Sequence, residues 1–155
     1  MSMSVTPLQD AFWLACEQML LDHTYPMDLD TALVSWGYSI GPCEAQDLMG
    51  LDVVLTARSG STPAPVLARM VAEGRLGKVN NLGFFCYSND GGKVADPLVD
   101  DLIREEANFA GRIRDELKGP AIVAKLHDLV GPVLRSDPKG AAAQLHITPF
   151  KVDTI

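Results

Sequence analysis

The histidines of this 155-residue chain are the side chains best suited to acid–base chemistry near neutral pH. His23 follows a predicted helix next to Asp22, His127 stands beside Asp128, and His146 lies near the C-terminus. A general base needs an orienting partner and a reacting atom within reach, and neighbours in sequence do not form such a dyad. No two of these histidines have the spacing of metal ligands. We therefore expect His23 at the surface of a loop, His127 at a solvated helix position and His146 in the tail. We expect none of them to form a catalytic or a metal site.

Two groups of charged residues could also do chemistry. Glu44 and Asp47 are three residues apart on one predicted helix face, as in a paired-carboxylate site. Glu44 also falls in the first turn, where the helix dipole favours an anion, so a structural or interface role is the stronger interpretation. Arg69, Arg75 and Lys78 form a cationic cluster that could meet phosphates. The alternative is a solvated rim that compensates the C-terminal dipole of a helix.

Motifs that would hold a cofactor are missing from the sequence. With 13 glycines the chain has no G-x-G, so the dinucleotide fingerprint is absent, as are the Walker loop, G-x-S-x-G and H-E-x-x-H. Cys16, Cys43 and Cys86 are odd in number and widely spaced, which predicts reduced, mostly buried thiols rather than a disulfide framework. We predict no catalytic residue, no metal and no cofactor held by this chain itself.

The composition is that of a globular protein and excludes several classes. Hydrophobic residues make up 47% and charged residues 21%, and Lys+Arg 13 against Asp+Glu 20 gives a net charge of −7. A chain this acidic is a poor partner for nucleic acid. The longest stretch without Asp, Glu, Lys or Arg, residues 31–43, is shorter than the ~20 residues that span a bilayer, so no membrane contact is expected. The N-terminus lacks the features of a secretory signal, which predicts a cytoplasmic protein.

The elements that must position these residues are helical nearly throughout, so the predicted fold class is all-α. Apolar residues recur at helical spacing over residues 7–21, 27–36, 42–56, 65–73, 97–113 and 120–134. We expect Gly50 to interrupt the third helix, and Gly131-Pro132 to kink the last. Residues 83–87 form the one strand-like segment, an aromatic plug on the helices that a turn at residues 89–92 follows.

Two stretches carry a more specific pattern. The first reads Asp30-Thr31-Ala32, Trp36-Gly37, Gly41-Pro42 and Asp47-Leu48-Met49-Gly50-Leu51-Asp52; the second reads Gly74-Arg75-Leu76-Gly77-Lys78 and Gly83-Phe84-Phe85-Cys86-Tyr87. In this order and spacing they resemble the C-terminal helical domain of the 3-hydroxyacyl-CoA dehydrogenases of fatty-acid β-oxidation, a 6-phosphogluconate dehydrogenase C-terminal-like fold. On this resemblance residues 1–87 are that domain, residues 88–135 a helical extension that resembles a truncated second copy, and residues 136–155 a tail.

The departures from the family pattern bear on the site. The family places an Asn near the start of the first helix, where it contacts substrate, and this chain has Val5, which cannot form that hydrogen bond. The family's Thr-Gly after the lysine becomes Asn80-Asn81. Asn tolerates a left-handed backbone, so we expect the turn to survive without the hydroxyl. The candidate contacts to coenzyme A or substrate are Arg75, Lys78, Asn80 and Asn81.

For the complete enzyme, the resemblance implies NAD-dependent oxidation of a 3-hydroxyacyl-CoA, with NAD and the catalytic His–Glu pair on a Rossmann domain. The present chain is then expected to be the substrate-side and dimerisation part and to be inactive alone. NAD would come only through a separately encoded Rossmann partner. The alternative is a non-catalytic acyl-CoA-binding or assembly module. The resemblance also implies a homodimer, with Glu44, Asp47, Leu48 and Leu51 at its interface.

Overall fold

A computed structural model describes residues 6–58 and 63–131 of the chain. Its α-helices are α1 (Pro7–Asp22), α2 (Pro26–Trp36), α3 (Pro42–Met49), α4 (Leu51–Ala57), α5 (Pro65–Ala72), α6 (Pro97–Phe109) and α7 (Pro120–Val130). A short 3₁₀ helix, η1 (Lys78–Asn80), precedes the hairpin of β1 (Phe85–Tyr87) and β2 (Lys93–Ala95). The prediction of an all-α fold is confirmed.

Local sequence explains where the helices begin. Each described helix of eight or more residues starts at a proline, whose fixed φ suits the first helical position and whose missing N–H costs nothing there. The Thr6 side chain accepts the Gln9 N–H at 3.1 Å, and Asp96 accepts the Leu98 N–H at 3.0 Å. Gly50, at φ 101°, separates α3 from α4, which confirms the predicted interruption.

The structure corrects the sequence prediction at three places. Strand β2 was not predicted; it pairs antiparallel with β1 in the register Phe85↔Ala95. Helix α6 ends at Phe109, before the predicted limit of residue 113. Leu98, Phe109 and Ile113, three apolar residues of the predicted helix over residues 97–113, are exposed. The predicted kink at Gly131-Pro132, the helix to residue 134 and the tail lie outside the described residues.

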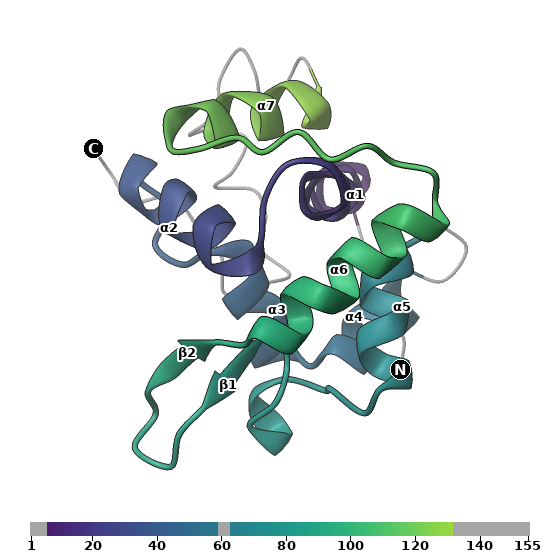
Figure 1. The fold of residues 1–155 in the computed structure, drawn as a ribbon. Coiled ribbons are helices and arrows are strands. Elements are labelled where there is room, and N and C mark those ends of the chain that lie inside the picture. Colours follow the sequence, from purple (N-terminus) through teal and green to yellow (C-terminus); the bar gives the residue numbers. More distant parts are fainter. Residues whose placement is uncertain (1–5, 59–62, 132–155) are drawn as a thin grey trace.

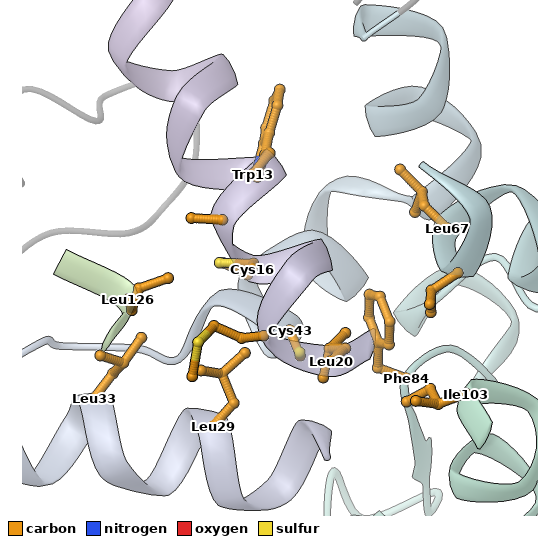
Figure 2. Close-up of a cluster of buried hydrophobic side chains, with 14 of the residues drawn as sticks. Trp13, Cys16, Leu20, Leu29, Leu33, Cys43, Leu67, Phe84, Ile103 and Leu126 are labelled. Atoms are coloured by element: carbon orange, nitrogen blue, oxygen red, sulfur yellow. The ribbon is translucent and has the colours of Figure 1, made fainter. Parts of the chain in front are cut away.

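Helix α1 runs through the middle of the molecule, with α5, α6 and α7 against it (Figure 1). The core cluster joins residues from both sides of residue 87, among them Met19 of α1, Ile103 of α6 and Leu126 of α7. Leu33 of α2 and Leu126 point into this cluster in Figure 2. No described helix is both long and apolar enough to cross a membrane.

Candidate functional site

The segment from residue 77 to residue 87, here the anchored loop, is held by one carboxylate of α3. Asp47 Oδ1 accepts the Phe84 N–H at 2.9 Å, and Oδ2 accepts the Phe85 N–H at 3.2 Å and the Tyr87 hydroxyl at 2.6 Å. Asp47 is 1% exposed, and burial raises its pKa to about 6. These three donors stabilise the carboxylate inside the protein and fix the path of the loop.

Two glycines allow the anchored loop to approach α3 this closely. A β-carbon on Gly83 would overlap the Asp47 carboxylate, and one on Gly77 would overlap the Asp47 backbone carbonyl. Gly77 also has φ +115°, a conformation that L side chains rarely adopt. The Gly77 N–H donates to the Leu82 carbonyl at 3.0 Å, which closes the turn. The loop and α3 are therefore in close contact and joined by hydrogen bonds.

The structure gives the four predicted coenzyme A contacts different environments. Arg75 is 7% exposed; its Nε donates to the Gly83 carbonyl at 2.9 Å and its Nη2 to Asp96 at 2.7 Å, which ties the loop to the start of α6. Asn80 Nδ2 donates to the Gly74 carbonyl at 3.0 Å. Asn81 has φ 61° and ψ 18°, so the predicted left-handed turn is confirmed.

Lys78 is the candidate contact whose charged group is best placed to meet a ligand. Its ammonium lies 4.5 Å from the centre of the Tyr87 ring, a cation–π contact, and the side chain is half-buried. In the part of the chain that the structure describes, Lys78 has no ion-pair partner. The contact between these four residues and coenzyme A stays a prediction.

Arg69 does not join Lys78 in a cationic cluster. Its guanidinium pairs with Glu73 at 3.0 Å and with Glu105 and Glu106 at 2.9 Å each. A phosphate at this position would face three carboxylates, so the geometry favours the interpretation of a compensated rim.

The predicted interface residues separate into buried and accessible ones. Asp47 and Leu51 lie in the chain's own interior, at 1% and 0% exposure. Leu48 is 48% exposed, next to α4, where Val53 is 43% exposed. Glu44 pairs with Lys93 of β2 at 2.9 Å. Leu48 and Glu44 are thus the two that a partner could touch, and the homodimer itself stays a prediction.

The prediction that His127 is a solvated helix position is wrong. The residue is 7% exposed, its Nε2 lies 3.0 Å from the Tyr38 hydroxyl oxygen, and its ring meets Trp36 edge-on at 4.8 Å. Desolvation lowers the pKa of His127. Leu126 and Val130 flank it on α7, and its place one turn after Val123 was the available signal.

His23 contacts the segment between α6 and α7 rather than its neighbour Asp22. His23 Nδ1 lies 2.7 Å from the Asp115 carbonyl oxygen, while Asp22 pairs with Arg112 rather than with His23. His146 and Val5 lie outside the described residues. Within residues 6–58 and 63–131, no group of three or more His, Cys, Asp or Glu is arranged to hold a metal ion.

Two further buried carboxylates have a role that the sequence did not reveal: Asp30 was noted only as part of the family-like pattern, and Glu17 was not singled out. Asp30 accepts the N–H groups of Cys43 and Glu44, both at 2.9 Å, at the start of α3. Glu17 accepts those of Val66 and Leu67 at the start of α5. Burial raises the pKa of both carboxyl groups to about 7. Asp30, Glu17 and Asp47 therefore share one structural role, in which a buried carboxylate holds the N–H groups of a distant segment.

Comparison with known proteins shows which family the chain resembles. Residues 5–87, more than half of the chain, match the family described as 3-hydroxyacyl-CoA dehydrogenase, C-terminal domain. The crystal structure of the dehydrogenase part of multifunctional enzyme 1 from C. elegans is similar, with a TM-score of 0.67 and 20% sequence identity. The match covers 90% of this chain and 33% of that chain, so the present chain spans about a third of that structure. At this identity the likeness concerns the fold, and it confirms the predicted helical domain.

Proposed function

Since the chain belongs to the 3-hydroxyacyl-CoA dehydrogenase C-terminal domain family, we propose that it forms the substrate-side and dimerisation part of an NAD-dependent 3-hydroxyacyl-CoA oxidation in fatty-acid β-oxidation. In this proposal a Rossmann domain outside residues 1–155 supplies NAD, which takes the hydride, and the catalytic His–Glu pair, which takes the hydroxyl proton. The chain described here is then inactive alone.

The observation that carries the proposal is the network of Asp47. It joins two segments that resemble the family pattern and lie 37 to 40 residues apart in sequence. Gly77 and Gly83 allow the close approach that the network needs. A loop held in this way presents Lys78 in a fixed place, where its ammonium could meet a phosphate of coenzyme A. Arg75, Asn80 and Asn81 act in this proposal chiefly by shaping that loop.

Dimerisation would use the exposed apolar side chains of α3 and α4. Leu48 and Val53 are each more than two-fifths exposed although both are large and apolar. Burying them against the same face of a second copy would give a two-fold interface, with the Glu44–Lys93 ion pair at its rim.

The test is a reconstitution assay. The pure chain is incubated with 3-hydroxybutyryl-CoA and NAD, alone and with a separately produced Rossmann domain of the same family, and NADH is followed by absorbance. We expect no turnover by the chain alone and turnover on mixing. Steady turnover by the chain alone would contradict the proposal, as would a mixture that forms no complex and no NADH.

A second candidate is a non-catalytic acyl-CoA-binding or assembly module. The observation that favours it is Asn80, whose amide donates to the Gly74 carbonyl where the family has a threonine hydroxyl. Calorimetric titration with acetoacetyl-CoA, with free coenzyme A as the control, separates the two. Saturable binding of the acyl form together with failure of the reconstitution assay would favour the module.

A further inference from the structure

A groove of about 500 Å³ lies between α2 and the first turns of α7, away from the anchored loop. Figure 1 shows α7 beside α2 at this end of the molecule. The floor consists of Ala32, Ile122 and Val123, all less than a tenth exposed. The half-buried Trp36 and the exposed Pro120 add apolar surface around them. The volume falls within the ~300–1,000 Å³ range of small-ligand sites.

One edge of the groove carries polar groups from a single face of α2. Asp28, Thr31 and Ser35 are spaced by three and four residues, so they follow one another along the helix. All three are exposed, and Asp28 has no ion-pair partner among the residues that the structure describes. The edge therefore offers a carboxylate and two hydroxyl oxygens, which can all accept hydrogen bonds.

The charge balance at the mouth of the groove favours a cation. Lys118 lies on the rim, but its ammonium already pairs with Glu116 at 2.9 Å. Among the described lining residues Asp28 is the one carboxylate and Lys118 the one ammonium, and Lys118 is engaged by Glu116, which lies outside the groove. The whole chain has a net charge of −7. A cation entering the groove is thus attracted both locally and by the field of the protein.

The start of α7 does not reverse this preference. A helix N-terminus attracts anions through unpaired N–H groups. Here Pro120 has no N–H, the Ala121 N–H donates to the Lys118 carbonyl at 3.2 Å, and the Ile122 N–H donates to the Gly119 carbonyl at 3.0 Å. These bonds leave the first turn of α7 with little to offer a carboxylate or phosphate.

We propose that this groove binds an amphipathic amine, with the apolar body against Trp36 and Pro120 and the ammonium at Asp28. Asp28 and Trp36 are eight residues apart, about 12 Å along the helix, so the ligand is elongated. Thr31 and Ser35 accept further N–H groups between these ends. The site shares no residue with the anchored loop, so this inference goes beyond the proposed function and is independent of it.

The test compares three ligands of equal length: n-hexylamine, 1-hexanol and hexanoate, titrated calorimetrically into the full chain at pH 7. We expect saturable binding of the amine, about tenfold tighter than the alcohol, and the weakest binding for hexanoate. Equal affinity for all three would overturn the proposal, and so would the absence of saturable amine binding.

Three variants locate the site. Ser35→Phe fills the groove from an exposed position and should abolish amine binding. Val34→Phe is its matched control, because Val34 is the preceding residue of α2, is 46% exposed and does not line the groove. Asp28→Asn should bring the affinity for the amine down to that for the alcohol and leave the alcohol unchanged. Equal effects of the two phenylalanine variants, or an unchanged preference in Asp28→Asn, would overturn the assignment.

Discussion

Gly83 packs so closely against the Asp47 carboxylate that a single added methyl group would overlap Asp47 Oδ1. That oxygen is the one that accepts the N–H of the next residue, Phe84, at 2.9 Å. The contact therefore couples the helix that carries Asp47 to the aromatic segment that begins at Gly83. Loss of the close approach would leave a carboxylate in the interior without its donors.

Gly83→Ala tests this coupling. Gly83 is not among the glycines with a positive φ, so the effect of the substitution is steric. We expect the free energy of unfolding to fall by about 3 kcal/mol, from overpacking and the disturbed hydrogen bonds. Urea denaturation followed by circular dichroism measures the change.

Gly74→Ala is the matched control. A β-carbon there would meet nothing within 4 Å, although φ is +80°. The cost at Gly74 is therefore only the backbone strain of a left-handed residue, about 1 kcal/mol. Equal losses in the two variants would show that steric exclusion by Asp47 is not what requires glycine at position 83.

The buried carboxyl groups of Glu17 and Asp30 predict how stability depends on pH. Both have a pKa of about 7, above the ~4 of an unfolded chain, because burial disfavours the charged form. Between these values the folded state binds more protons than the unfolded state, so the free energy of unfolding falls as the pH rises. With the smaller effects of Asp47 and His127 included, we expect the chain to be roughly 3 kcal/mol more stable at pH 5.5 than at pH 7.5.

His127 opposes this trend without reversing it. Its pKa is lowered, so below pH 6.5 the unfolded chain binds a proton that the folded chain does not, which costs stability. One such group acts against two carboxyl groups, and Asp47, with a pKa of about 6, adds to the carboxyl side. Guanidinium denaturation at pH 5.5, 6.5 and 7.5 is the measurement. A free energy of unfolding that rises steadily with pH would contradict the prediction.

The sequence predicted where the helices begin better than it predicted which side chains are buried. Prolines mark the starts, because their backbone geometry suits only the first turn, and this signal is local. Strand β2 could not be predicted in the same way, since it contains Lys93 and the exposed Val94 and owes its form to pairing with β1. Periodicity gives the direction of a side chain but not what covers it.

The candidate site shows the same limit. The role of Arg75 depends on Gly83 and Asp96, which lie 8 and 21 residues further along the chain. Arg69 was grouped with Arg75 because the two are close in sequence. The sequence does not show the three carboxylates that neutralise Arg69. His127 is likewise buried by packing against Trp36 and Tyr38 of a distant segment. The roles of Arg75, Arg69 and His127 are set by residues that are distant in sequence and that the fold brings into contact with them.

Arg114 predicts the behaviour of the segment between α6 and α7. Its guanidinium donates to the Thr24 carbonyl at 2.6 Å and to the Tyr25 hydroxyl at 2.8 Å, and it lies 4.2 Å from the centre of the Tyr25 ring. Lysine keeps the charge but loses the planar, multiply donating group. In Arg114→Lys we expect about tenfold faster hydrogen exchange at Asp115 and Leu117, whose N–H groups bond to the α1–α2 corner.

Arg104→Lys is the control for this variant. Arg104 also donates to the Tyr25 hydroxyl, at 2.9 Å, but its side chain is 51% exposed and it makes no bond to the α1–α2 backbone. Its replacement should leave the exchange at Asp115 and Leu117 unchanged. If both variants accelerate exchange equally, the Tyr25 hydroxyl rather than the Thr24 carbonyl holds the segment.

Leu48→Asp tests the proposed dimer. Leu48 is 48% exposed on α3, while Leu51 and Asp47 are buried in the chain itself, so the substitution reaches the surface without disturbing the core. A carboxylate at the centre of an apolar two-fold interface faces its own copy, and the paired like charges should weaken association about a hundredfold.

Sedimentation velocity should show a dimer for the natural chain and a monomer for the variant. Val94→Asp, at an exposed position of β2, is the control that should stay dimeric. A monomer in the natural chain, or a dimer unaffected by Leu48→Asp, would place the self-association surface elsewhere or exclude it.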